Sequence, residues 1–217
     1  EMTSSLVGSE MCIRDREIWN KEIGIAPERI FRFGKADNFW EHGAGPCGPC
    51  SEVYYDRGEK YGCGSPDCTV GCECDRYMEI WNNVFMEFYK DENGKYSKLK
   101  QHNVDTGLGL ERMTMLLEGK ETPFETELFA PIMDKLVELQ KVDNIASRRI
   151  VAEHLRSSMM IICDGGRPSN VDRGYILRRL IRRMVRHMNK LQISLDELST
   201  LCLLYTSPSP RDSTSSR

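Results

Sequence analysis

Long apolar segments are missing from this 217-residue sequence, and so is an apolar N-terminal stretch preceded by basic residues. A membrane-spanning helix needs about 20 mostly apolar residues, and a secretory signal joins a basic start to an apolar stretch. We therefore expect a cytoplasmic protein without a membrane partner. Apolar residues make up 40% of the chain and charged residues 29%, which is typical of a globular protein with a buried core.

Acidic residues are nearly absent from residues 171–193, although the whole chain carries a formal net charge of -3. Only Asp172 accompanies a series of cations, which comprises Arg173, Arg178, Arg179, Arg182, Arg183, Arg186 and Lys190. Apolar residues of the same segment recur at helical spacing, at positions 176, 177, 180, 181, 184, 185 and 188. The pattern predicts a helix that packs on one side and presents guanidinium groups beside it. A solvated surface is the usual meaning of such a run, but the lack of compensating acids favours phosphate binding.

The sequence also lacks a secretion signal, so we do not expect the oxidising environment in which disulfides form. The nine cysteines are therefore expected to be metal ligands or free thiols. Four of them, Cys63, Cys68, Cys72 and Cys74, follow the spacing C-x4-C-x3-C-x-C in a segment bounded by glycine and proline. Four thiolates suit a tetrahedral structural Zn²⁺ site without catalytic function. A reduced, exposed insertion between strands is the alternative. The C-x-x-C pair at Cys47 and Cys50 is interpreted as loop packing.

Strand patterns occupy the first half of the chain. Val53–Tyr55 and Tyr77–Phe88 are rich in aromatic and β-branched residues, which predicts strands of an antiparallel sheet. A turn is expected at Lys90–Gly94, and the Gly/Pro/Cys-rich segment Gly43–Cys50 is expected to be a loop. These elements place a sheet region within residues 17–125.

Helical spacing dominates from Glu127 onward, and Gly165, Gly166 and Pro168 separate the last two long helices. The expected fold class is therefore α+β. The expected regions are a sheet region at 17–125 with a cysteine-rich insertion at 57–75, and a helical region at 126–200. We interpret residues 1–16 and 201–217 as non-native tails, and the second, rich in Ser, Thr, Pro and Arg, as disordered.

The string DTGLGLER at residues 105–112 combines two glycines with an arginine. Glycines let the backbone approach a ligand closely, and an arginine can grip a phosphate with two donors. The string is therefore typical of a nucleotide site. A glycine turn before an ordinary helix, with Arg112 on the solvated side, is the alternative.

Five strings in a fixed order carry a resemblance to a known family. They are NFW at 38–40, GPCGPCSE at 45–52, DRYMEIWNNVFM at 75–86, VDTGLGLER at 104–112 and PSNVDRGYILRRLIRR at 168–183. Together they make residues from Glu17 to about Asn189 resemble class II alanyl-tRNA synthetases. The resemblance implies a fragment of an alanine-tRNA ligase, an enzyme that activates alanine with ATP to alanyl-adenylate and transfers it to the 3′ end of tRNA(Ala). This chain would carry the C-terminal part of the antiparallel-sheet catalytic core and the start of the helical tRNA-recognition region.

The resemblance also assigns roles to single residues. Asp105 would neutralise the ammonium group of alanine as a buried carboxylate, and the amino-acid pocket would be lined by Trp40, Asn82, Val84 and Gly107. ATP would be bound by Glu79, Gly109, Glu111 and Arg112, with Arg112 on the triphosphate and Glu79 holding Mg²⁺. The alternative is that Trp40 is a core aromatic, Glu79 a surface residue and Asn82 an edge residue.

The basic segment resembles the part of the family that approaches the tRNA acceptor stem. Asn170 matches a position implicated in reading a G·U pair through the minor groove, and Arg182 would contact the same region. Phosphate contacts would come from Arg173, Arg178, Arg179, Arg183 and Arg186.

Several parts of the family pattern have no counterpart in the sequence. The first two class II motifs are absent, and the four histidines show no H-x3-H spacing of the kind an editing hydrolase needs. We therefore expect the isolated chain not to aminoacylate tRNA. A non-catalytic, zinc-stabilised RNA-binding module is the alternative function.

Overall fold

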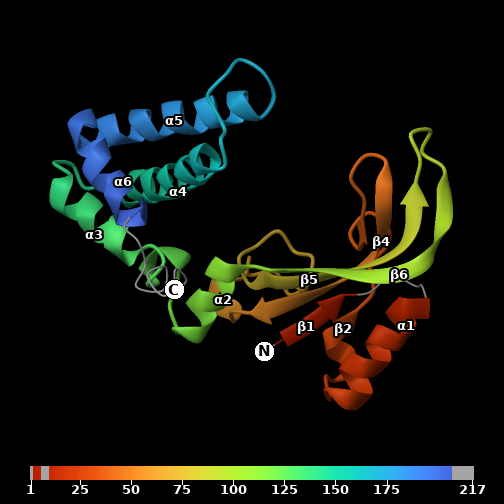
Figure 1. Cartoon of the computed structure of the whole chain (residues 1–217). Helices are drawn as coiled ribbons and strands as arrows, with labels where there is room; N and C mark the ends of the chain where they lie inside the picture. Colours follow the sequence, from red (N-terminus) through yellow and green to blue (C-terminus); the bar gives the residue numbers. More distant parts are fainter. Residues whose placement is uncertain (1, 6–9, 207–217) are drawn as a thin grey trace, which may run out of the picture. The chain divides into compact units, whose positions relative to one another are not determined.

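The computed structural model of this protein describes residues 2–5 and 10–206, which form two compact units divided between Met113 and Thr114. The first unit is built on a six-stranded sheet with the order β2-β1-β4-β5-β6, and β3 pairs with β4 in addition (Figure 1). The strands are β1 Met2–Ser5, β2 Ile30–Phe31, β3 Phe39–Trp40, β4 Gly45–Asp56, β5 Tyr77–Lys90 and β6 Tyr96–Leu108. Helix α1, Glu10–Glu17, continues into a π-helical turn at Ile18–Glu22.

The central part of the sheet is antiparallel, as the strand patterns predict. Strand β4 pairs with β5, and β5 pairs with β6, both in antiparallel register. The turn expected after β5 is present, because the Asp91 side chain accepts hydrogen bonds from the backbone of Asn93 and Lys95. Gly94 takes the positive φ of 80° that completes this turn. The α+β fold class is therefore confirmed.

Two strand boundaries differ from the prediction. Residues 45–50 form the start of β4 rather than a loop, and the pairing explains why this stretch contains glycine. A Cβ atom on Gly48 would lie 1.8 Å from the carbonyl oxygen of Phe85, so only glycine fits between the strands. Strand β6 was not predicted before Gly107, because nearly all of its side chains are exposed and show no alternation of apolar and polar residues.

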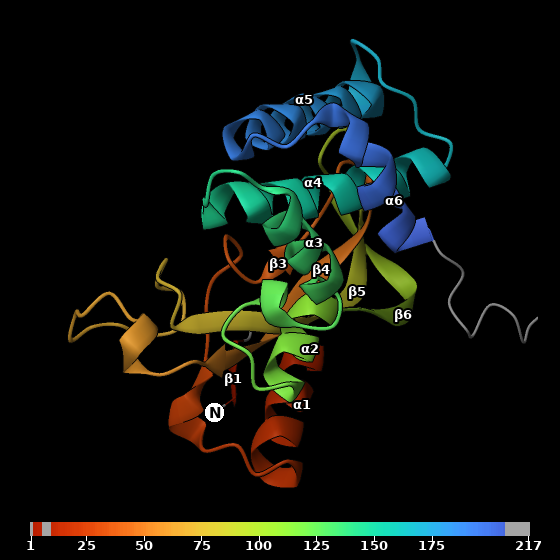
Figure 2. The same cartoon turned by 90° about the vertical axis from the view of Figure 1, so that its left-hand side faces the viewer.

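The second unit is helical, and Figure 2 shows α4 running beneath α5 within it. Helix α2, Leu110–Leu117, crosses the division between the units, and α3 Ala130–Leu139, α4 Ile145–Cys163, α5 Asp172–Leu191 and α6 Leu198–Thr206 follow. Asn144 caps α4 by accepting a hydrogen bond from the backbone of Ser147 at 2.8 Å. The core contains Leu136, Val151, Leu155, Met184, Met188, Leu191 and Leu201. Among the described residues, no helix is long and apolar enough to cross a membrane.

The ends of the described chain take regular structure. Residues 2–5 pair with β2 and β4, and residues 10–16 lie in α1, within the segment interpreted as a non-native tail. The disorder predicted from residue 201 is wrong for Leu201–Thr206, which continue α6, because Leu201 is fully buried in the helical core. Residues 207–217 lie outside the described part of the chain. The non-native origin of both tails stays a prediction.

Candidate functional site

The register of three strands gathers most of the predicted amino-acid-binding residues on one face of the sheet. Asp105 lies opposite Val84, and Gly107 lies opposite Asn82. Directly paired residues point to the same face, and so do residues two apart along a strand. The face is therefore lined by Cys50 and Glu52 from β4, Asn82 and Val84 from β5, and Asp105 and Gly107 from β6.

A bulge brings Glu79 to this same face. Without it, the odd-numbered Glu79 would point away from the even-numbered Asn82. The register shifts between Val53 and Tyr54, so that Tyr54 pairs with Glu79 while Glu52 pairs with Asn82. Because Glu52 and Tyr54 are two residues apart on β4, their partners share one face. The bulge thus aligns the predicted Mg²⁺ ligand with the predicted alanine site.

Glu52 is a central group of this face that the sequence analysis did not single out. Its carboxylate accepts hydrogen bonds from Asn82 Nδ2 at 3.0 Å and from the Tyr54 hydroxyl at 2.5 Å. Burial raises the pKa of Glu52, and the Tyr54 hydrogen bond opposes this shift. The available signal was a carboxylate beside the apolar positions 53–55 of a predicted strand. Glu52 therefore fixes the amide of Asn82.

The orientation of Asn82 leaves its side-chain oxygen without a donor among the described residues. Its Oδ1 atom is enclosed and receives no hydrogen bond from the described residues. An enclosed carbonyl oxygen is costly unless water or a ligand supplies a donor. The ammonium group of an amino acid would supply such a donor.

Two predicted residues differ from expectation in their surroundings. Asp105 is exposed on the edge strand β6 rather than buried, because no further strand covers it among the described residues. Trp40 is 43% exposed on β3, whose partner in β4 is Gly48, and no hydrogen bond or ring contact in the described chain joins it to Asn82 or Val84. Glu52 and Glu79, by contrast, are both half-buried carboxylates of this face.

Arg112 closes one end of the face from helix α2. The backbone of Gly109 donates to the carbonyl oxygen of Ile80 at 3.0 Å and so attaches the start of α2 to β5, with Glu111 in the first helical turn. Arg112 Nη1 donates to the carbonyl oxygen of Glu79 at 2.5 Å and lies 3.7 Å from its Oε2. Both residues line a cleft of about 360 Å³, together with Tyr54, Arg57, Cys74, Asp75, Tyr77 and Met78.

The four predicted metal ligands come together beside this cleft. The sulfur atoms of Cys63 and Cys72 are 3.7 Å apart, those of Cys68 and Cys74 are 3.6 Å apart, and all four lie within 4.8 Å of one another. Zinc bound tetrahedrally to thiolates at about 2.3 Å requires sulfur atoms about 3.8 Å apart. The cluster therefore fits zinc.

The other C-x-x-C pair lies inside the sheet. Cys47 and Cys50 are both buried in β4. Burial raises the pKa of Cys50 to about 12, so that its thiol stays protonated. This environment agrees with the interpretation of the pair as packing residues.

Helix α5 presents its arginines to solvent as predicted. Arg173, Arg178, Arg179, Arg182, Arg183 and Arg186 are all exposed, whereas Leu177, Met184 and Met188 are buried. None of these six guanidinium groups is ion-paired to a carboxylate within the described residues. Arg178 Nη1 donates to Asn170 Oδ1, which holds Asn170 at the start of the helix.

A groove runs along this basic side of α5. Its volume is about 500 Å³, and it is lined by His154, Ile176, Arg179, Leu180, Arg182, Arg183 and Arg186. Ile176 was predicted to pack with the apolar stripe, but it is 55% exposed and lies in the groove instead. The groove therefore offers an apolar floor flanked by cations.

One histidine on α4 and one on α5 lead us to expect that acid destabilises the helical unit. Burial lowers the pKa of His154 and of His187, and Arg183 lowers both further, while Glu153 partly opposes the shift of His154. A histidine whose pKa is lower in the folded state than in the unfolded state stabilises the folded state at pH values above the unfolded-state pKa, which is near 6.5. This stability is lost as the pH falls through the folded-state pKa. We expect the melting temperature to drop between about pH 7.5 and pH 5.

The variant His154→Gln should show a smaller drop over the same pH range, measured by circular dichroism, because one titrating group is removed. His42→Gln is the matched control, since His42 lies in the other unit. An equal pH dependence in the unaltered chain and in His154→Gln would contradict the assignment.

Comparisons with known proteins identify the family of the chain. Residues 6–207 match the family described as tRNA synthetases class II (A). Alanine–tRNA ligase 1 of Lachnoclostridium phytofermentans is 58% identical over 177 residues. The alanine–tRNA ligases of Natranaerobius thermophilus and Acetivibrio thermocellus are 54% and 52% identical over the same length. Each comparison covers 79% of this chain and 20% of the relative, so the chain spans about a fifth of the length of these proteins. Since the family match extends over most of the sequence, the chain belongs to the class II tRNA synthetases.

Proposed function

We propose that this chain is part of an alanine-tRNA ligase and carries one side of its alanine-activating site. The observation that carries the proposal is the shared sheet face, on which the bulge in β4 and β5 aligns Glu79 with Asn82 and Asp105. The alanine–tRNA ligases at 52–58% identity support the choice of amino acid.

In the proposed reaction, a carboxylate oxygen of alanine attacks the α-phosphorus of ATP. A new P–O bond forms, the bond to the β-phosphate breaks, and pyrophosphate leaves. Arg112 would bind the phosphates and stabilise the charge that develops on them. Asp105 would neutralise the ammonium group, while Val84 and the amide held by Glu52 would leave room for a methyl side chain only.

The carboxylates of the face fit a magnesium ion. Glu79 provides hard oxygen ligands at the edge of the Arg112 cleft, the kind that Mg²⁺ prefers, and it would hold the ion beside the phosphates. When bound, Mg²⁺ would neutralise phosphate charge during the reaction.

We further propose that helix α5 binds the acceptor stem of tRNA(Ala). Six exposed arginines supply phosphate contacts that position a duplex without reading its sequence. Asn170 and Arg182 would provide the contacts to base edges in the minor groove. The apolar floor of the groove at Ile176 and Leu180 would pack against ribose or base surfaces.

We propose that the cysteine cluster binds one structural Zn²⁺. The purified chain is expected to contain about one zinc ion, and its melting temperature should fall when a chelator removes it. Cys63→Ser and Cys74→Ser should lose the metal, as measured by atomic absorption. Cys163→Ser is the matched control, because Cys163 is an exposed free thiol outside the cluster. Full zinc content in both cluster variants would contradict the proposal.

Activation by the chain alone is not expected. Because Asp105 is exposed on an edge strand, water would compete for the ammonium group of alanine. Alanine-dependent ATP–pyrophosphate exchange should therefore be undetectable for the 217-residue chain and present in a protein of the relatives' length that contains it. Equal activity of the two would contradict this account, and absence from both would favour the non-catalytic RNA-binding module.

A further inference from the structure

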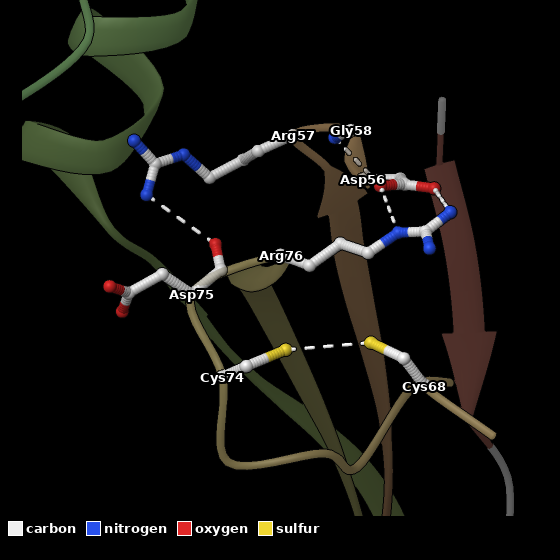
Figure 3. Close-up of polar contacts among 7 residues, drawn as sticks. All are labelled: Asp56, Arg57, Gly58, Cys68, Cys74, Asp75 and Arg76. Carbon is white, nitrogen blue, oxygen red and sulfur yellow. Dashed lines mark hydrogen bonds and ion pairs between the residues drawn. The ribbon is translucent and has the colours of Figure 1, made fainter. Parts of the chain in front are cut away.

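The cysteine cluster belongs to a loop whose two ends are fastened to each other. Arg76 binds Asp56 through two parallel hydrogen bonds, Nε to Oδ1 and Nη2 to Oδ2, each 3.0 Å long (Figure 3). The backbone of Arg57 donates to the carbonyl oxygen of Arg76 at 2.8 Å. The loop 57–75 therefore leaves β4 and returns to β5 with its two ends held together.

Arg57 leaves the base of this loop toward the cleft that contains Arg112. Its Nη1 donates to the carbonyl oxygen of Asp75 at 3.4 Å, and its guanidinium carbon lies 3.8 Å from the centre of the Tyr61 ring. Both of these contacts come from the cysteine loop. Arg57 and Arg112 both line the 360 Å³ cleft, so two guanidinium groups border one space.

Arg57 could serve only to hold the loop together, but that role would not explain why it lines the cleft. The base of the loop is already closed by Arg76 and Asp56. A guanidinium group has five N–H donors, so it can bind the loop and a ligand at the same time. Two arginines beside a carboxylate in a small cleft form an arrangement suited to a phosphate group and its metal ion.

The metal site adjoins the contact that orients Arg57. Cys74 lines the cleft itself and directly precedes Asp75, whose carbonyl oxygen accepts the Arg57 hydrogen bond (Figure 3). A metal bound to Cys63, Cys68, Cys72 and Cys74 would fix the backbone at residue 75. Without the metal, this part of the loop would gain conformational freedom, and Arg57 would lose its orientation.

We propose that Arg57 is a second phosphate-binding residue of the Arg112 cleft, and that a metal held by the cysteine cluster positions it through Asp75. The inference rests on the proposed function in one respect, namely that the phosphate belongs to ATP. Metal binding by the cysteine cluster would then set the affinity of the cleft for the triphosphate.

The test measures MgATP and inorganic tripolyphosphate binding to the zinc-loaded 217-residue chain by calorimetry. Arg57→Ala should weaken both by about tenfold or more, which is typical of removing a charge-assisted hydrogen bond to phosphate. Adenosine binding should not change. Arg32→Ala is the matched control, because Arg32 is exposed in the same unit and does not line the cleft.

Metal removal provides the second arm. Chelation should weaken MgATP binding to the unaltered chain and to Arg32→Ala, and added Zn²⁺ should restore it. Chelation should have little further effect on Arg57→Ala, because the metal acts through that residue. Far-ultraviolet circular dichroism checks that the sheet remains folded in each sample.

The outcomes separate the two proposals. If Arg112→Ala weakens binding and Arg57→Ala does not, the role of Arg57 is overturned while the nucleotide site stands. If chelation weakens the unaltered chain and Arg57→Ala equally, positioning by the metal is overturned. If the unaltered chain does not bind, or if neither arginine affects binding, the proposed nucleotide site fails and the inference fails with it.

Discussion

Replacing Arg112 by alanine is expected to slow alanine-dependent ATP–pyrophosphate exchange by about 10²-fold or more in a protein of the relatives' length that contains this sequence. Arg112 is anchored to the Glu79 carbonyl at the start of α2, where it lines the cleft with the carboxylate of Glu79. The substitution would remove a fixed donor from phosphates whose charge increases during the reaction. The exchange rate at saturating alanine measures this effect.

The conservative variant separates charge from geometry. Arg112→Lys keeps the positive charge but loses the planar pair of donors, so its activity should stay well below that of the unaltered protein. Arg32→Ala should leave the rate unchanged, because Arg32 is exposed and lies outside the cleft. Full activity of Arg112→Ala would place the ATP phosphates elsewhere.

Neutralising three arginines of helix α5 is expected to weaken binding of an acceptor-stem RNA hairpin by about 10- to 100-fold at low salt. The variant Arg182→Ala/Arg183→Ala/Arg186→Ala removes cations that line the groove and have no carboxylate partner among the described residues. The slope of log affinity against log salt should become shallower by about one for each phosphate that no longer binds an arginine. Fluorescence anisotropy with the 217-residue chain provides both quantities.

A control of equal charge distinguishes a local contact from a general charge effect. Lys95→Ala/Lys98→Ala/Lys100→Ala removes three cations near the start of β6, in the other unit. This variant should bind the hairpin nearly as well as the unaltered chain. Equal weakening by both triple variants would indicate nonspecific attraction and would remove the case for α5 as the acceptor-stem site.

Local patterns in the sequence were sufficient to predict the elements that depend on local spacing. The arginines of α5 are exposed because apolar residues at helical spacing turn Leu177, Met184 and Met188 inward. The four cysteines meet within one loop, 57–75, whose two ends lie on the paired strands β4 and β5. The family resemblance is confirmed by the match over residues 6–207.

Features that depend on pairing between distant residues were not predictable in the same way. The composition of residues 45–50 is typical of a loop, and only the placement of Gly48 against the backbone of Phe85 explains the strand. The orientation of Glu79 depends on a bulge that no local pattern reveals. The partial burial of Glu52 likewise follows from its contacts with Tyr54 and Asn82. The roles of these site residues remain predictions, whereas their arrangement on one face is a property of the structure.

The amino-acid dependence of ATP–pyrophosphate exchange tests the central claim most directly. A protein of the relatives' length that contains this sequence should catalyse exchange with alanine, and much less with valine, whose larger side chain would meet Val84 and Asn82. Asp105→Asn should abolish the alanine-dependent signal, because the ammonium group loses its carboxylate. Exchange that prefers another amino acid, or that is unaffected by Asp105→Asn, would contradict the assignment of this sheet face to alanine activation.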